Sequence, residues 1–404
     1  MQYRAISADG HINEPPELWV KNLPEKYRDR GPHVIETKNT KGHAWIMEGQ
    51  TRPSVMGFSS MYFKSQGKRF DRASLIEQFK QMKNRGVRYE DLFPGSYDPH
   101  ERVKEITEDK IDAEVIFNGV GTVWNGIKLC PDKDLSLACF KVYNDWMVEF
   151  QEAAPERFRC NATLPTTGLK DCLEELKRCY DMGLRTVQLE AYPSGDFTNP
   201  TPEDDEFWAL AVEMDIPVNI HTMFFFPYGD LGSRITAEGV ADSKVRAQAK
   251  GVDLNAGTFP VILWRMMQSG VFERHPRLKL VGSEVQCGWV PYYIERFDES
   301  VKRNRAEWKL PLLPSEYLAR NVWLVYIEDE LGVLNRYNIG VDRIMWGPVF
   351  PHSSSAWPVD LELGLEILQR AGATASEIER IMWKNCADVF NIPYDDPKTI
   401  SVAA

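Results

Sequence analysis

The sequence Ser7-Ala8-Asp9-Gly10-His11-Ile12-Asn13-Glu14-Pro15-Pro16 follows a short β-like opening segment. Side chains alternate between the two faces of an extended chain, so Asp9 and His11 are expected to point the same way at the end of a first strand. A carboxylate oxygen and an imidazole nitrogen both bind zinc, iron or manganese. By itself an Asp-x-His triplet is more often part of an ordinary turn, so the metal interpretation depends on what the rest of the chain places nearby.

Composition narrows the class of protein. The chain has 404 residues, 43% of them hydrophobic, which allows one large domain or two medium ones with a sizeable core. A net charge of −11 argues against a nucleic-acid partner and against an anionic membrane surface. No stretch approaches the roughly 18 apolar residues of a membrane span, and no signal peptide is apparent. The seven cysteines are scattered without a Cys-x-x-Cys motif, which is typical of reduced thiols, so a cytoplasmic protein is expected.

The segment 15–97 is rich in Gly, Pro, Lys and Arg and shows little periodicity, except that residues 43–49 suggest a small hairpin. We expect a single domain over residues 1–404, in which 15–97 is an insertion or lid region that could cover a site. Asp98 and Pro99 then predict the start of a helix, with Asp98 as N-cap and Pro99 at the first helical position.

Strand-like and helix-like segments alternate through the rest of the chain. After the first strand, strands are expected at 113–117, 159–165, 186–189, 216–221, 278–284, 322–326 and 343–347. Helices are expected at 134–154, 169–182, 204–214, 260–269, 290–302, 329–338, 360–371 and 375–387. Eight strands that alternate with helices predict a parallel sheet, and in a chain of this length a closed (β/α)8 TIM barrel. A doubly wound open sheet is the alternative, but no Gly-x-Gly-x-x-Gly follows any strand.

In such a barrel the carboxyl ends of the strands build the active site. His221 ends the fifth predicted strand, Glu284 ends the sixth, and the eighth leads to His352. Asp9 and His11 would meet His221 across the barrel mouth, which favours a metal role for His221 over that of a hydrogen-bonded barrel histidine. Glu284 could equally hold a loop amide, and His352 could equally cap a turn, so their roles stay open at this point.

Several motifs resemble the amidohydrolase-2 family, in the aminocarboxymuconate-semialdehyde decarboxylase-like branch of the amidohydrolase superfamily. The resemblance covers nearly the whole chain and rests on the segments 7–19, 97–102, 217–221, 270–279, 284–291 and 340–347. It implies a distorted TIM barrel with a long insertion after strand 1 and one divalent metal ion, zinc first, with iron or manganese possible. It implies Asp9, His11 and His221 as the metal ligands. It also implies a small, often aromatic, carboxylated substrate and a homodimer.

One position departs from the family pattern. The strand-eight motif of the family reads Trp-Gly-Ser-Asp-Tyr-Pro-His, with an Asp that touches the metal or acts as general base. Here residues 346–352 read Trp-Gly-Pro-Val-Phe-Pro-His, so Val349 replaces the carboxylate. Three explanations are open: an altered catalytic strategy, a weakened or absent metal, or a deliberately introduced inactivating substitution. Glu284 is the nearest substitute as ligand or general base, and His352 is the next.

Substrate contacts are less clearly indicated. The segment 222–228 directly after His221 is apolar and aromatic, so Phe224 and Phe225 are candidates to contact a flat or hydrophobic substrate. Trp124 and Tyr326 could extend the same wall. A packed lid or a subunit contact would explain the segment equally well.

These observations predict a metal-dependent enzyme that cleaves a C–X bond by hydrolysis or a C–C bond by non-oxidative decarboxylation in a hydrophobic or aromatic carboxylated substrate. In the hydrolytic version Glu284 shuttles the proton of the attacking water. In the decarboxylating version a protonated Glu284 or His352 delivers a proton to the ring carbon. The alternative is a metal-free barrel that has kept the scaffold as a binding protein or a non-hydrolytic enzyme, because Val349 replaces the carboxylate.

Overall fold

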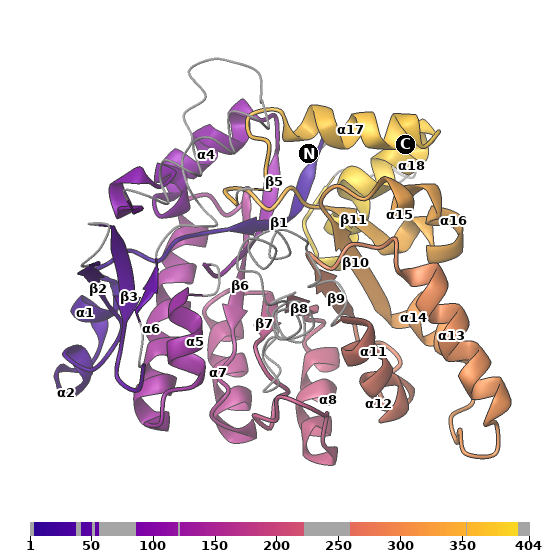
Figure 1. Ribbon diagram of the computed structural model, residues 1–404, viewed down its shortest axis with the longest axis horizontal. Coiled ribbons are helices and arrows are strands. Elements are labelled where there is room, and N and C mark those ends of the chain that lie inside the picture. Colours follow the sequence, from indigo (N-terminus) through magenta and orange to yellow (C-terminus); the bar gives the residue numbers. More distant parts are fainter. Residues whose placement is uncertain are drawn as a thin grey trace, which may run out of the picture.

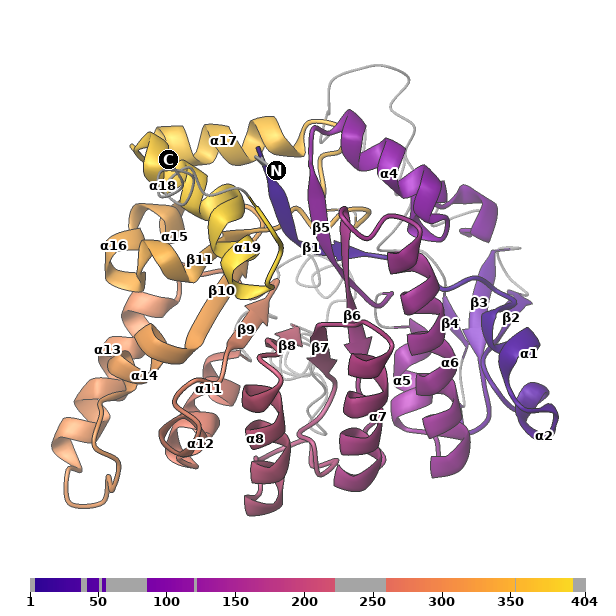
Figure 2. The same cartoon turned by 180° about the vertical axis from the view of Figure 1, so that it is seen from behind.

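The computed structural model describes residues 4–37, 42–50, 53–55, 86–119, 122–221, 259–352 and 354–394. Eight parallel strands form one sheet in the order β1-β5-β6-β7-β8-β9-β10-β11, with helices around its outside (Figures 1 and 2). The strands are β1 (Ile6–His11), β5 (Ala113–Phe117), β6 (Phe158–Thr163), β7 (Thr186–Leu189), β8 (Val218–His221), β9 (Leu280–Ser283), β10 (Val322–Tyr326) and β11 (Ile344–Trp346). The predicted TIM-barrel class is confirmed.

The barrel closes where the first strand meets the segment that follows the last one. The backbone N–H of Val349 donates to the carbonyl of Asp9 (3.0 Å), and the N–H of His11 donates to the carbonyl of Phe350 (2.8 Å). This approach requires a glycine at 347, because a Cβ there would lie 2.7 Å from the backbone nitrogen of Asp9. The closure therefore places the loop after β11 directly beside the two candidate ligands of β1.

The main helices match the predicted segments to within one or two residues. They are α4 (Pro99–Glu108), α6 (Lys133–Glu152), α7 (Leu169–Asp181), α8 (Asp205–Glu213), α11 (Phe259–Gln268), α13 (Val290–Arg303) and α17 (Asp360–Arg370). Asp98 caps α4 as predicted, with its side chain accepting from the N–H groups of His100 and Glu101, and Pro99 is its first residue. The predicted last helix runs as α18 (Ala375–Glu379), a π-helical turn η6 (Arg380–Lys384) and α19 (Asn385–Val389).

Some elements differ from the prediction or were not predicted. The predicted helix 329–338 is two short helices, α15 (Glu330–Leu334) and α16 (Arg336–Ile339). Further helices are α5 (Thr122–Lys128), α12 (Val271–Arg274) and α14 (Pro314–Asn321), with 3-10 turns η3 (Pro202–Asp204) and η5 (Val341–Arg343). Elements of three to eight residues span at most about two turns, which is too short for apolar periodicity to be visible in a sequence.

The described part of the region 15–97 is more regular than expected. It holds α1 (Leu18–Asn22), α2 (Glu25–Arg28), the 3-10 turns η1 (Tyr89–Asp91) and η2 (Pro94–Ser96), and a three-stranded antiparallel sheet of β2 (His33–Glu36), β3 (His43–Ile46) and β4 (Ser54–Val55). The segment 43–49, where a small hairpin was expected, holds one strand, β3, which pairs with β2 on one side and β4 on the other. The helices α1 and α2 and the small sheet lie on the flank of the barrel beside α5 and α6 (Figure 1), where the Trp19 indole donates to the carbonyl of Cys139 (3.0 Å). Whether the region covers the site remains a prediction.

Two hydrophobic clusters fill the fold. Ile6, Ala8, Val115 and Met345 belong to the cluster inside the barrel, together with Trp383 from the π-helical turn. The larger cluster lies between the sheet and the surrounding helices and holds most of the other buried apolar residues. Among the described residues, no helix combines the length and apolar character needed to cross a membrane.

Candidate active site

A β-bulge aims the first two candidate ligands into the barrel. In the pairing of β1 with β5, Ser7 lies opposite Glu114 and Gly10 opposite Ile116, so β1 carries one extra residue between them. Ile6 and Ala8 pack inside the barrel, and strict alternation would then turn Asp9 and His11 outward. The extra residue shifts the phase by one position, so that Asp9 and His11 also face inward.

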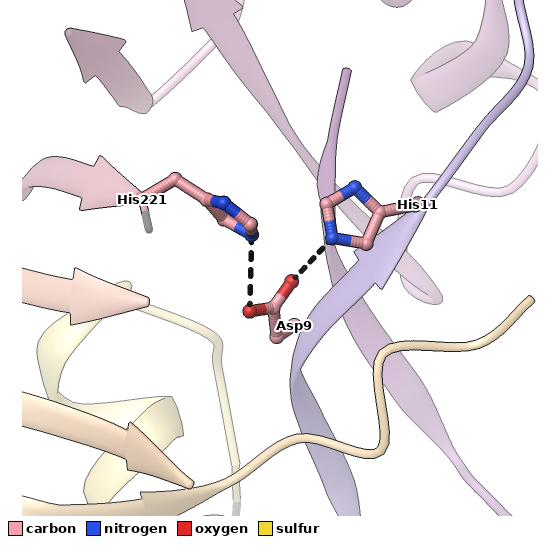
Figure 3. A group of neighbouring side chains, drawn as sticks. All are labelled: Asp9, His11 and His221. Atoms are coloured by element: carbon pink, nitrogen blue, oxygen red, sulfur yellow. Dashed lines mark ion pairs between the residues drawn. The ribbon is translucent and has the colours of Figure 1, made fainter. Parts of the chain in front are cut away.

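Asp9, His11 and His221 meet at the carboxyl ends of β1 and β8 (Figure 3). The Asp9 Oδ1 lies 3.2 Å from the His11 Nε2, and the Asp9 Oδ2 lies 3.5 Å from the His221 Nε2. The two imidazole rings stand nearly perpendicular, with their centroids 4.9 Å apart. The structure therefore brings together the three residues for which a metal role was predicted.

The chemistry of this group fits a divalent cation. All three side chains are buried, and neither Asp9 carboxylate oxygen nor the His11 Nε2 has a hydrogen-bond partner among the described residues. Buried polar atoms without partners are rare in folded proteins, because their lost hydration is not replaced. One carboxylate and two imidazoles are a usual donor set for zinc, iron or manganese.

The pKa shifts of Asp9 and His221 also favour a negatively charged carboxylate at the centre of the group. Burial favours the neutral form of Asp9, but the charges of His221 and His11 outweigh it and lower the pKa of Asp9. Burial likewise disfavours a charged His221, but the Asp9 carboxylate raises the pKa of His221. A metal ion would thus compete with a proton on His221 for the same carboxylate.

Glu284 and His352 complete the group. The Glu284 Oε2 lies 3.4 Å from the His221 Nε2, and the Glu284 side chain is 16% exposed, whereas that of His221 is 4% exposed. The His352 ring stacks on that of His11, and its Nε2 has no hydrogen-bond partner among the described residues. Burial, reinforced by repulsion from His11 and His221, holds the pKa of His352 well below its usual value, so its imidazole is neutral.

Val349 lies next to the candidate metal ligands, because its backbone N–H donates to the carbonyl of Asp9. It is fully buried and has a φ of +57°, a left-handed conformation that is unusual for a β-branched residue. Asp and Asn tolerate this conformation better than Val. The local backbone therefore suits the carboxylate of the family motif better than the residue that is present.

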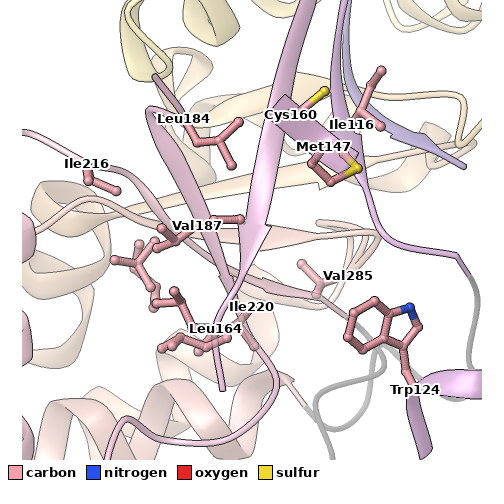
Figure 4. Close-up of a cluster of buried hydrophobic side chains, with 14 of the residues drawn as sticks. Ile116, Trp124, Met147, Cys160, Leu164, Leu184, Val187, Ile216, Ile220 and Val285 are labelled. Carbon is pink, nitrogen blue, oxygen red and sulfur yellow. The ribbon is translucent and has the colours of Figure 1, made fainter. Parts of the chain in front are cut away.

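The structure describes two of the four residues that were predicted to contact a substrate. Trp124 lies in the outer hydrophobic cluster (Figure 4), with its ring against Tyr143 (4.7 Å) and its indole N–H donating to Glu14 (2.7 Å). Tyr326 also belongs to the outer cluster and is fully buried. Both side chains are thus buried in this cluster, and whether either contacts a substrate stays a prediction. Phe224 and Phe225 lie outside the described residues.

The comparisons with known proteins agree with this geometry. The family model described as amidohydrolase matches residues 133–392, well over half of the chain, and includes His221, Glu284 and His352. The chain belongs to the amidohydrolase family. The predicted resemblance is thereby confirmed, and with it an amidohydrolase-type enzyme from a metal-dependent family. The alternative of a metal-free binding protein is not favoured.

Amidohydrolases with similar sequences or structures include decarboxylases. A gamma-resorcylate decarboxylase of Rhizobium sp. is 25% identical over 244 residues, which are 56% of this chain and 69% of the relative. An amidohydrolase of Mycobacterium avium subsp. paratuberculosis has a TM-score of 0.73 at 24% identity, over 96% of this chain and 98% of its own. A dihydroxybenzoic acid decarboxylase of Polaromonas sp., solved with bound manganese and 2-nitroresorcinol, has a TM-score of 0.62 at 16% identity, over 98% of both chains. These two solved structures show the fold.

The sequence analysis did not identify the polar residues that surround the candidate metal ligands. The His11 Nδ1 donates to the carbonyl of Asn118 (2.8 Å), which orients the ring so that Nε2 faces Asp9. The Asn118 amide donates to Glu190 (3.0 Å), and Glu190 pairs with Lys128 (2.6 Å) in a site where both side chains are buried. Asn118 and Glu190 directly follow β5 and β7, so the strand-end rule applied to all eight strands would have identified them.

Proposed function

We propose that this amidohydrolase is a metal-dependent, non-oxidative decarboxylase of a hydroxylated aromatic carboxylate. The convergence of Asp9, His11 and His221 carries the metal part of the proposal, together with the buried Asp9 carboxylate oxygens and His11 Nε2, which have no hydrogen-bond partner among the described residues. The decarboxylases among its relatives support the reaction class. Zinc, iron and manganese are the candidate metals: the donor set suits all three, and manganese is present in the Polaromonas structure.

Val349 favours decarboxylation over hydrolysis. Hydrolysis needs a base that takes a proton from the attacking water; valine cannot accept one, so Glu284 alone would have to serve as that base. Decarboxylation consumes no water and needs a proton donor instead. Removal of the strand-eight carboxylate therefore costs the hydrolytic reaction more than the decarboxylation.

A divalent cation held by Asp9, His11 and His221 would bind and orient the substrate carboxylate. Cleavage of the C–C bond releases CO2 and leaves an electron pair on the ring carbon. This carbon must then accept a proton. Glu284 is the proposed donor, because its partial exposure lets it regain a proton from solvent after each turnover. Neutral His352 can hydrogen-bond a ring hydroxyl through its free Nε2 and so orient the ring.

Elemental analysis of the purified protein tests the metal site. His221→Ala is compared with His275→Ala, whose histidine contacts Asp205 away from the site. About one transition metal per chain in the parent and in His275→Ala, and none in His221→Ala, is the expected result and also identifies the metal. A parent without stoichiometric metal, after purification with added zinc or manganese, would overturn the proposal.

Substrate assays test the reaction. We expect CO2 release from at least one of 2,6-dihydroxybenzoate and its positional isomers, and a loss of about 100-fold or more in kcat for Glu284→Gln. Turnover of an aryl ester or lactone panel with no CO2 release from any dihydroxybenzoate would instead establish hydrolysis. A Glu284→Gln variant with parental kcat would remove Glu284 from the mechanism.

A further inference from the structure

Arg102 is an arginine with no solvent exposure, positioned on the outer side of β1. Its Nε and Nη2 donate to the two carboxylate oxygens of Glu114 (2.7 and 3.3 Å), and the Glu114 side chain is also fully buried. Two-point contact with a carboxylate fixes the plane of the guanidinium. Arg102 is therefore held rigidly by β5, the strand that pairs with β1.

The remaining donors of Arg102 reach the two segments that carry the site. Nη1 donates to the carbonyl of His11 (3.0 Å), and Nη2 donates to the carbonyl of Phe350 (2.9 Å). The guanidinium also stacks on the Phe350 ring at 4.5 Å. The same Phe350 carbonyl accepts from the backbone N–H of His11. One side chain thus ties the end of β1 to the loop that leads to His352.

Gly10 makes room for this arrangement. A Cβ at position 10 would lie 2.8 Å from the Arg102 Nη2 and 3.0 Å from the Glu114 Oε1. The residue between Asp9 and His11 must therefore lack a side chain if the guanidinium is to reach both carbonyls. The Asp-Gly-His sequence and the buried arginine are parts of one structural unit.

We propose that Arg102 is a positioning residue for the candidate metal centre. Its contacts set the position of the His11 ring relative to the His352 ring. It touches neither ring and acts through the backbone carbonyls of His11 and Phe350. Its effect on metal affinity rests on the proposed function, whereas its effect on the two histidine rings does not. Outer contacts that orient ligands in this way typically change metal affinity by about 10- to 100-fold.

Arg336 provides a matched control elsewhere in the fold. Its side chain is 5% exposed and pairs with Glu377 (3.3 Å), and it also donates to the backbone carbonyls of Val333 and Ala371. It contacts none of the site residues. Arg102→Lys and Arg336→Lys each remove a planar donor set from a buried pair, and both are expected to lower the Tm.

Two measurements separate positioning from general stability. In the metal-free protein, 15N-histidine NMR should show shifted ring signals for His11 and His352 in Arg102→Lys and parental signals in Arg336→Lys. The Kd for zinc or manganese should rise about 10- to 100-fold in Arg102→Lys and less than twofold in Arg336→Lys. Parental histidine signals in a folded Arg102→Lys would overturn the proposal.

The proposed metal-dependent function and the proposed role of Arg102 can fail independently in these experiments. A parent that binds neither metal would reject the proposed function, while the histidine spectra would still decide the role of Arg102. If Arg102→Lys does not fold, Glu114→Gln decides in its place, because it keeps the shape of the pair and removes its charge. A folded Glu114→Gln should show the same histidine shifts at smaller size, and a parental spectrum there would overturn the proposal.

Discussion

The imidazole rings of His11 and His352 lie face to face, with centroids 4.0 Å apart and planes inclined by 13°. The stack joins a candidate metal ligand on the first strand to a neutral histidine in the loop after the last strand. It gives His352 a fixed position at the mouth of the barrel without making it one of the three residues around Asp9.

His352→Phe tests this division of roles. The phenyl ring preserves a stack on His11 but removes both ring nitrogens, so we expect unchanged metal content and a fall in kcat of about 100-fold or more. Elemental analysis and steady-state kinetics measure the two effects. His100→Phe, at an exposed histidine of α4, should change neither quantity. Loss of the metal in His352→Phe would show that His352 is a ligand instead.

Val349→Asp should restore the carboxylate of the family motif. The new side chain is expected to lower the metal Kd by about tenfold or more, since it adds an anionic ligand. It should destabilise the metal-free protein, because a further carboxylate is buried beside Asp9. Titration calorimetry and thermal unfolding with and without metal measure both effects.

Val349→Asn is the matched control for that change. Asn tolerates the left-handed backbone at position 349 as well as Asp does but carries no charge. It should therefore stabilise the metal-free protein by up to about 1 kcal/mol and leave the metal Kd within a few-fold of the parent. An equal gain in affinity from both variants would mean that backbone strain, and not the missing carboxylate, limits binding.

Metal binding should stabilise the parent in proportion to its occupancy. At a free metal concentration 100 times the Kd, the expected gain in the free energy of unfolding is about 2.7 kcal/mol, and a chelator should reverse it. Asp9→Asn should abolish this gain. Asp205→Asn, which breaks the ion pair with Arg274 on the outside of the barrel, should retain it. A metal-dependent rise in Tm that survives in Asp9→Asn would place the binding site elsewhere.

The pair Asp109–Asp360 predicts a specific dependence of stability on pH. Both carboxyl groups are buried, and burial together with their mutual contact raises the pKa of Asp109, while burial raises the pKa of Asp360. Because the pKa values in the folded state lie above those in the unfolded state, the stabilising contribution is complete below the ordinary carboxyl range. It is lost as the pH rises through the raised values.

Asp109→Asn should remove that loss, because an amide can donate to Asp360 at every pH. Relative to the parent, the variant should gain about 1–2 kcal/mol of unfolding free energy between pH 5 and pH 9. Urea denaturation across this range measures the gain. Asp29→Asn, at an exposed aspartate that ends α2, should follow the parent curve. Parallel curves for Asp109→Asn and the parent would show that the pair holds no proton at neutral pH.

The sequence alone determined the eight barrel strands, the main helices and their order. Local signals are sufficient for this: Asp98 and Pro99 start α4 where capping chemistry predicts, and the strands Ala113–Phe117, Thr186–Leu189 and Val322–Tyr326 have the predicted bounds. The strand-end rule then placed Asp9, His11, His221, Glu284 and His352 at one end of the barrel, because parallel strands all point their carboxyl ends the same way.

Only the tertiary structure decided which faces and partners those residues have. The bulge in β1 turns Asp9 and His11 inward, and its position depends on the pairing with β5, which sequence alternation does not report. Trp124 and Tyr326 were predicted to line a substrate wall, and only the structure shows that both are packed in the larger buried cluster. Arg102 is distant from His11 and Phe350 along the chain, and barrel closure alone brings its guanidinium to both carbonyls. Contacts of this kind depend on three-dimensional closure, whereas secondary structure depends mainly on neighbours within a few residues.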